Sequence, residues 1–145
     1  MTRLILVGTD GSDTATKAVQ RAAELARESG ATLHIVTAVT HAIAPTELEV
    51  EALPADRRWQ ASPGVVADEV LRRAAALAEP DVAVELHSEP GDPADVIIRL
   101  AETLAVDLIV VGNKGMHGMS GYVRPSVPNR ISHHSPTDLL IVRTR

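Results

Sequence analysis

The sequence contains no cysteine and almost no aromatic residues. The absence of cysteine excludes disulfide bonds, thiolate nucleophiles and metal sites built on cysteine. The aromatic residues are Trp59 and Tyr122, with no phenylalanine, so the core must be built from alanine, valine, leucine and isoleucine. Proteins that stack single-stranded nucleic acid on their surface need several aromatic faces. This composition therefore argues against that mode of binding.

The sequence also lacks an excess of positive charge and any long apolar run. It has 14 Lys and Arg against 19 Asp and Glu, a formal net charge of -5, whereas nucleic-acid-binding domains are typically basic. No stretch approaches the roughly 18 apolar residues of a membrane span, and the apolar run within MTRLILVG is too short for a signal peptide. We therefore expect a cytoplasmic protein that has neither nucleic acid nor a membrane as a partner.

What the sequence does contain is typical of a globular domain. The chain has 145 residues, of which 45% are hydrophobic and 23% are charged. A chain of this length buries about 68–70% of the surface that its unfolded form exposes, which is enough for one core. We expect a single domain over residues 1–145.

Short apolar runs alternate with longer helical patterns along the chain. The expected strands are residues 4–7, 33–39, 82–86, 108–111 and 139–142, and apolar residues recur at helical spacing over 15–26, 66–78 and 96–104. A fourth helix is expected to begin near residue 127. Alternating strands and helices imply right-handed parallel crossovers, and continuous apolar strands are typical of a sheet covered on both faces. The pattern predicts an α/β fold with a doubly wound, five-stranded parallel sheet.

Several residues predict where the helices begin and end. Ser12 or Asp13 is the expected N-cap of the first helix, and Gly30 is its expected C-terminal stop. The second helical pattern is expected to end at Pro80. Asp92 is expected to cap the third helix, with a proline at its first position.

Two segments interrupt the alternation of strands and helices. Residues 42–62 are acidic and contain prolines, and we expect a surface excursion there with one helical turn around 47–53. Residues 112–126 follow a buried strand directly and carry glycine at 112, 115, 118 and 121. The second segment is the more informative, because it leaves the sheet at an end where ligands bind.

Ligands of open parallel sheets bind beyond the carboxyl ends of strands, where the strand order reverses. Two turns have this position: Thr9, Asp10 and Gly11 follow the first strand, and a glycine-rich segment follows the fourth. Ser126 is the expected N-cap of a helix that begins at Val127, and the positive end of such a helix attracts phosphate. The glycine spacing is neither that of the P-loop nor that of the dinucleotide fingerprint. By itself, it fits a flexible loop as well as a phosphate cradle.

Two blocks of sequence add a family resemblance. The first block is VGTDGSDTATKAVQRAAELA and the second is VVGNKGMHGMSGYVRPSVPNRISHHSPTDLLIV. Together they resemble the universal stress protein family over the whole chain, most weakly across residues 42–62. The resemblance implies a strand order of 3-2-1-4-5, a dimer and, in one subgroup, a bound ATP. That subgroup has the pattern G-x2-G-x9-G-S/T after the fourth strand.

The nucleotide motif of that subgroup is matched in part. Gly112 and Gly115 match its first two glycines and Ser126 matches its hydroxyl, but Pro125 stands at the third glycine. Proline removes a backbone N–H that a phosphate could accept from. The loss of one charge-assisted donor costs about 1.5–3 kcal/mol, which corresponds to an affinity about 10- to 100-fold lower. We expect weakened rather than abolished binding, with Lys114 or Arg124 supplying positive charge to the phosphates.

The resemblance also implies roles for residues at the ends of the other strands. An acid at the position of Asp10 contacts the ribose in the family, and the alternative role of this residue is an N-cap or an Asx-turn. Val39 lies where family members line the adenine pocket, and Val111 and Val127 are further candidates. For all three valines, a place in the core is the alternative.

Other candidate residues are weaker. His133 and His134 are adjacent, so they do not face one another on a helix, and we expect no metal site there. His117 lies in the glycine segment with nothing in the sequence to orient it. No Ser–His–Asp arrangement is recognisable around Ser120 or Ser126, so we predict no catalytic residue.

The last expected strand carries a dimer prediction. Leu139, Leu140, Ile141 and Val142 form a strongly apolar strand at a sheet edge, where unpaired backbone groups invite a partner. Related proteins pair this strand with its copy across a two-fold axis. We therefore expect a symmetric homodimer through these four residues.

Three functions remain open from the sequence. The first is a regulatory stress protein that binds ATP, with AMP or cyclic AMP as alternatives and Mg²⁺ accompanying ATP. The second is a dimeric stress protein that has lost nucleotide binding through Pro125 and acts by protein contacts. The third is a slow ATPase or autokinase with a phosphate acceptor among Ser120, Ser126 and Ser132, although the sequence offers no convincing base for it.

Overall fold

A computed structural model describes residues 3–39, 51–52, 54–56, 63–113 and 127–143. Five strands form one sheet in the order β3-β2-β1-β4-β5, and every neighbouring pair is parallel. The elements are β1 (Leu4–Gly8), α1 (Asp13–Ser29), β2 (Thr32–Val39), α3 (Pro63–Ala76), β3 (Val84–Pro90), α4 (Pro93–Leu104), β4 (Leu108–Gly112), α5 (Val127–His134) and β5 (Asp138–Val142). The predicted fold class and strand order are confirmed.

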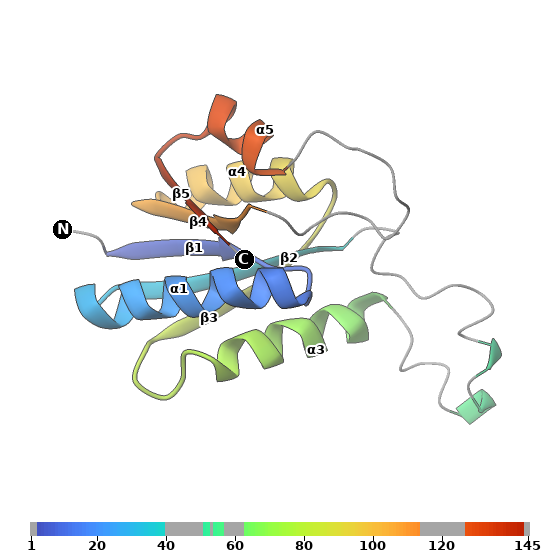
Figure 1. The fold of residues 1–145 in the computed structure, drawn as a ribbon. Coiled ribbons are helices and arrows are strands. Elements are labelled where there is room, and N and C mark those ends of the chain that lie inside the picture. Colours follow the sequence, from blue (N-terminus) through green and yellow to red (C-terminus); the bar gives the residue numbers. More distant parts are fainter. Residues whose placement is uncertain (1–2, 40–50, 53, 57–62, 114–126, 144–145) are drawn as a thin grey trace.

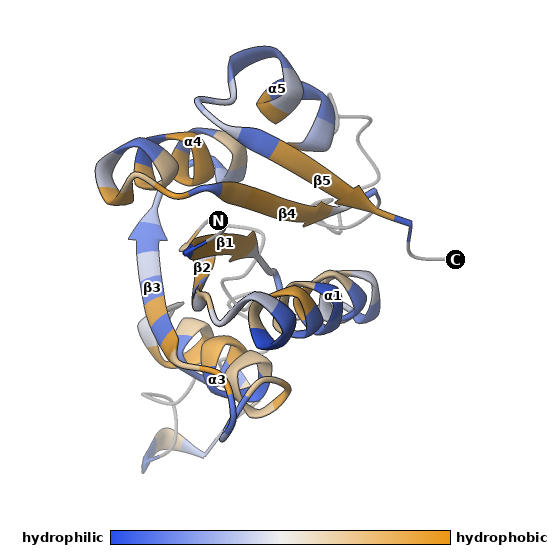
Figure 2. Ribbon diagram, turned by 90° about the vertical axis from the view of Figure 1, so that its left-hand side faces the viewer, coloured by the Kyte–Doolittle hydropathy of each residue, from blue (hydrophilic) through white to orange (hydrophobic). Residues whose placement is uncertain are grey.

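The helices cover both faces of the sheet (Figure 1). Alternate side chains of each strand point to opposite faces, and in β1 this sends Ile5 and Val7 toward α1 and α3 and Leu6 toward α4 and α5. Two buried clusters result, one under each helix pair, and both consist of aliphatic residues and alanine. Figure 2 shows β1 and β4 as apolar along their length, as expected for central strands buried on both faces.

Specific residues fix the ends of α1 and α4. Ser12, rather than Asp13, is the N-cap of α1, because its side-chain oxygen accepts from the Ala15 N–H. Gly30 ends the same helix with a φ of 72°, in the left-handed region that suits glycine. Asp92 caps α4 by accepting from the backbone N–H groups of residues 94 and 95, with proline at the first helical position.

The third strand differs from its predicted position. The sequence predicts residues 82–86, whereas β3 spans Val84–Pro90 and pairs with β2 as far as Val39 and Pro90. Val82 lies buried in the core before the strand begins. The error has a physical cause: β3 is an edge strand with alternating exposed residues, so hydrogen bonding to β2 sets its length and a continuous apolar run does not. In Figure 2 most of the β3 ribbon has the colours of hydrophilic or intermediate residues.

Among the described residues, no helix is long and apolar enough to cross a membrane. The helical turn predicted around residues 47–53 falls mostly outside the described residues, as does the glycine-rich segment from 114 to 126.

Candidate functional site

The carboxyl ends of β1, β2 and β4 form what we call the carboxyl edge of the sheet. In the register, Val7 of β1 pairs with Val110 of β4, and Gly8 of β1 pairs with Val36 of β2. From β1 the chain passes through α1 to β2 on one side, while β4 lies on the other side. The strand order therefore reverses between β1 and β4, which is where open parallel sheets bind ligands.

The turn after β1 is held by short hydrogen bonds. Thr9 is buried, and its N–H donates to the Val36 carbonyl at 2.9 Å. The Gly11 N–H donates to the Thr9 hydroxyl at 3.1 Å, and the Ser12 N–H donates to Asp10 Oδ1 at 2.9 Å. The last contact is an Asx-turn, one of the local roles considered for Asp10, while the N-cap role belongs to Ser12. The turn places the Asp10 carboxylate at the carboxyl edge in a fixed orientation.

Gly11 packs this turn against the neighbouring helix. Its φ is 82°, a conformation that side chains rarely adopt, and a Cβ placed on it would lie 3.0 Å from the Val70 Cγ2 atom of α3. Only glycine avoids both the strain and the contact. Thus α3, which is distant in sequence, helps to fix the position of the turn.

The end of β2 contributes a half-buried valine and an unusual hydroxyl. Val39 is the last residue of β2, and its carbonyl accepts from the Gly91 N–H at 3.4 Å. Two residues earlier, Thr37 is completely buried, and its Oγ1 is the buried side-chain polar atom in the described part of the chain that has no hydrogen-bond partner. A buried hydroxyl without a partner is costly, so its position near the carboxyl edge requires an explanation.

The end of β4 brings backbone, rather than side chains, to the carboxyl edge. The Val111 side chain is buried in the cluster under α4 and α5, and the half-buried Val127 at the start of α5 packs against the same cluster. Gly112 ends β4, and the next N–H, that of Asn113, donates to the Val142 carbonyl of β5 at 2.9 Å. The core placement considered for these two valines is therefore what the structure has.

The structure thus brings together part of the predicted set. Thr9, Asp10, Val39 and Gly112 lie at the carboxyl edge. The other four predicted residues, Lys114, Gly115, Arg124 and Ser126, lie outside the described residues, as do Pro125, His117 and Ser120.

An ion-pair network holds α5 against α4. The Arg130 guanidinium of α5 donates to the N-cap carboxylate of Asp92 at 2.6 Å and to Asp95 at 3.0 Å. Both are charge-assisted hydrogen bonds, which are short and directional. They tie the helix that follows the glycine-rich segment to the start of α4. Sequence periodicity does not predict this contact, because it joins residues 35 and 38 positions apart.

A polar cluster that was not predicted from the sequence lies away from the carboxyl edge. His34 of β2 and Glu85 and His87 of β3 lie together, and we call them the His–Glu–His cluster. Burial lowers the pKa of His34. The charge of Glu85 opposes this shift, and that of His87 adds to it. The cluster was not predicted because the third strand was expected to end at residue 86, one position before His87. His133 and His134, by contrast, lie exposed in the last turn of α5.

The fold places this chain among the doubly wound parallel α/β proteins, a class whose ligands bind where the strand order reverses. Comparison with known proteins specifies it further. The universal stress protein family model matches residues 1–143. The universal stress protein Rv1636 of Mycobacterium tuberculosis is 31% identical over 144 residues, which are 98% of this chain and 97% of that protein. This chain belongs to the universal stress protein family.

Solved structures agree with this assignment. A universal stress protein crystallised in complex with cAMP is 33% identical, with a TM-score of 0.71, and the match covers 99% of this chain and 98% of that one. The universal stress protein of Archaeoglobus fulgidus in complex with dAMP is 21% identical, with a TM-score of 0.67 and 96% of each chain covered. The second likeness concerns the fold alone. The family resemblance noted in the sequence is confirmed.

Proposed function

We propose that this protein, as a single domain over residues 1–145, is a cytoplasmic regulatory protein of the stress response that binds an adenine nucleotide at the carboxyl edge. ATP is the first ligand to test, with AMP and cyclic AMP as alternatives. The observation that carries the proposal is the fixed Asp10 turn beside the end of β4, at the reversal of strand order. A universal stress protein 33% identical to this chain was crystallised with cAMP, which supports an adenine nucleotide in particular.

The residues present fit such a ligand. A carboxylate at Asp10 suits the two hydroxyls of a ribose, because an ionised carboxylate only accepts hydrogen bonds. Gly112 allows close approach of a phosphate to the backbone, since it has no side chain.

We assign the remaining predicted residues by their chemistry. Gly115 would offer backbone N–H groups, Ser126 a hydroxyl, and Lys114 and Arg124 positive charge to the phosphates, with Mg²⁺ accompanying ATP. Thr9 shapes the turn, and Val39 would border the adenine. Val111 and Val127 would act through their backbone and through the packing of the β4 end, because their side chains belong to the core.

The experiment is titration calorimetry of the tag-free protein with ATP, with and without Mg²⁺, and with AMP and cyclic AMP. GTP serves as the base-specificity control. Mass spectrometry of gently purified protein identifies any nucleotide that is retained. Heat from an adenine nucleotide and none from GTP is the expected result. An absence of heat together with an absence of retained nucleotide contradicts the proposal.

That negative result would favour the second function, a dimeric stress protein that acts through protein contacts. Its specific support is Pro125, which stands where the ATP-binding pattern has glycine. The two functions share the same fold and family, so nucleotide binding is the property that separates them.

We also propose a homodimer through β5. This strand lies at one end of the sheet order, and within the part of the chain that the structure describes it pairs with β4 alone. Its apolar residues Leu139, Leu140, Ile141 and Val142 are half-buried or exposed, with Ile141 44% exposed. An edge strand of this kind is a liability unless it is covered, and pairing across a two-fold axis would cover it.

A further inference from the structure

The His–Glu–His cluster lies on two neighbouring strands at the other end of the sheet. Glu85 of β3 pairs directly with His34 of β2, and His87 pairs with Val36. Residues two apart on a strand share a face, so Glu85 and His87 point to the same side as His34. His34 Nδ1 lies 2.9 Å from His87 Nε2 and 3.3 Å from Glu85 Oε2. One donor atom from each residue falls within 4.8 Å of the other two.

The two separations that involve His34 are close to those of a coordination sphere. Zinc binds imidazole nitrogen and carboxylate oxygen at about 2.0–2.2 Å, so two ligands of a tetrahedral ion lie about 3.3 Å apart. The separation between His34 and Glu85 already has this value, and the separation between the two imidazoles needs to widen by only about 0.4 Å. Two histidines and a carboxylate are also the donor set of many three-ligand zinc sites.

The burial of the three residues is graded from inside to outside. The His34 side chain is 4% exposed and the Glu85 side chain is 64% exposed. His87 is half-buried and stacks on His34, with ring centroids 5.1 Å apart. An ion could therefore enter from solvent on the Glu85 side, with a water completing its coordination, while the buried imidazole holds one ligand rigid.

The cluster could also have a purely structural role, without a metal ion. One imidazole N–H donates to the other ring nitrogen, and this hydrogen bond satisfies a buried histidine without any ion. A metal ion would take the place of that shared proton. The two roles differ in one measurable respect: in a metal site Glu85 supplies a ligand to the ion, so removing its carboxylate weakens the binding of Zn²⁺.

We propose that His34, Glu85 and His87 form a binding site for a divalent transition metal ion, with Zn²⁺ as the expected occupant. His34 lies five residues before Val39, about 16 Å along an extended strand. The site is therefore separate from the carboxyl edge and does not depend on the proposed nucleotide function. Because His34 lies on β2 and the other two ligands lie on the edge strand β3, a bound ion would link the two strands.

The experiment uses tag-free, chelator-treated protein without nucleotide, titrated with ZnCl₂ and followed by calorimetry and by elemental analysis after dialysis. Wild type is expected to hold one Zn²⁺ per chain. Glu85→Gln and His87→Gln are each expected to weaken binding about 10-fold or more, since even the loss of an outer-shell partner costs that much. His133→Gln and Glu102→Gln, which remove the same groups from exposed positions, are the matched controls.

Two further readouts keep the test decisive. Co²⁺ bound by wild type is expected to show the visible absorption of a tetrahedral site, and Glu85→Gln is expected to lose it. Zn²⁺ should raise the unfolding temperature of wild type but not of Glu85→Gln, because only a ligand bound to the folded state stabilises it. Wild type that binds Zn²⁺ no more tightly than His87→Gln, or a loss of equal size in His133→Gln, would overturn the proposal.

Discussion

The Asp10 carboxylate accepts a hydrogen bond from the Ser12 N–H at 2.9 Å, and Ser12 in turn caps α1. One turn therefore orients the candidate ribose-binding group and begins the first helix. Any change at Asp10 could act through either role, so a useful variant must preserve the turn while it alters the charge.

Asp10→Asn meets this requirement. The amide oxygen can still accept from the Ser12 N–H, and asparagine forms Asx-turns as aspartate does. We therefore expect the free energy of unfolding to change by less than about 0.5 kcal/mol. The negative charge is lost, and the affinity for an adenine nucleotide should fall by about 10- to 100-fold, as for the loss of a charged hydrogen bond. Calorimetry and urea unfolding measure the two effects separately.

The control is Asp13→Asn, which removes an exposed carboxylate three residues away at the start of α1. It should leave nucleotide affinity unchanged. If Asp10→Asn binds nucleotide as wild type does, Asp10 is a turn residue only, and its assignment to the ribose is wrong.

Three glycine substitutions test how the same turn is held. Gly64→Ala introduces a Cβ that meets nothing, and Gly30→Ala adds a Cβ in open space but at a φ of 72°. Gly11→Ala combines a φ of 82° with a contact to Val70 at 3.0 Å. A left-handed conformation costs a residue other than glycine about 1–2 kcal/mol. We expect the loss of unfolding free energy to increase from Gly64→Ala to Gly30→Ala to Gly11→Ala.

Urea unfolding of the three variants checks this order. If Gly11→Ala and Gly30→Ala lose the same free energy, then Val70 gives way and the contact with α3 does not position the turn. In that case α3 has no part in holding the carboxyl edge.

Asp107 gives a prediction about acid stability. Its carboxylate accepts the backbone N–H groups of Arg3 and Leu4, at 2.8 and 3.0 Å, and these hydrogen bonds hold the pKa of Asp107 below its ordinary value. Because the pKa is lower in the folded state, this carboxylate stabilises the fold above the unfolded-state value of about 3.9. That stabilisation is lost as the pH falls through the folded-state pKa.

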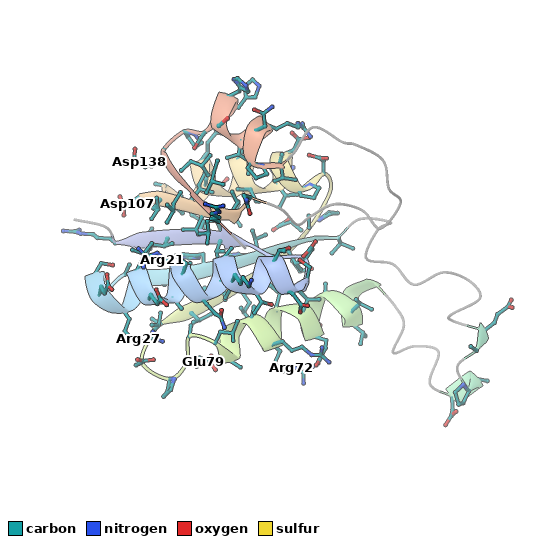
Figure 3. All side chains as sticks on the ribbon, viewed as in Figure 1. Arg21, Arg27, Arg72, Glu79, Asp107 and Asp138 are labelled. Atoms are coloured by element: carbon teal, nitrogen blue, oxygen red, sulfur yellow. The ribbon has the colours of Figure 1, made fainter. Side chains whose placement is uncertain are left out.

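Asp107→Asn should therefore be less stable than wild type at pH 7, with a difference that shrinks below about pH 4. Figure 3 shows Asp107 and Asp138 at the amino edge of the sheet, where β4 and β5 begin and which lies opposite the carboxyl edge. Asp138→Asn removes an exposed carboxylate from the same edge and serves as the control. A stability difference between Asp107→Asn and wild type that does not change with pH would show that these hydrogen bonds do not depend on the charge.

Much of the fold could be predicted from the sequence because its central strands are apolar on both faces. β1 and β4 carry such runs, and the caps at Ser12, Gly30 and Asp92 are set by local chemistry. The edge strand β3 could not be placed correctly, since its exposed and half-buried residues carry no continuous apolar signal.

The candidate sites divide in the same way. The position of Asp10 and Gly112 at the carboxyl edge could be predicted, because each lies at or just after the end of a buried strand. The contact between His34 and His87 could not, because it depends on the register of β2 with β3, which no local pattern encodes. The same holds for the unpartnered hydroxyl of Thr37, whose burial is a property of the packed molecule.

The proposed dimer can be tested with two residues of equal exposure. Ile141 on β5 and Leu86 on β3 are both 44% exposed and lie on opposite edge strands. Ile141→Lys should convert the dimer into a monomer in sedimentation at micromolar concentration, because a charge on an edge strand opposes pairing. Leu86→Lys should leave the mass unchanged. A wild-type particle of 15.4 kDa, the mass of one chain, would contradict the dimer directly.

Pro125→Gly separates the two functions proposed for this protein. Glycine restores the backbone N–H and the third position of the nucleotide pattern, so affinity for ATP should rise by about 10- to 100-fold. Val123→Gly adds the same backbone freedom two residues earlier without restoring the pattern, and it should not raise the affinity. If wild type binds no ATP and Pro125→Gly does, the native chain acts without nucleotide. If both bind ATP equally, residue 125 does not contribute to phosphate binding, and the expected weakening of the site is wrong.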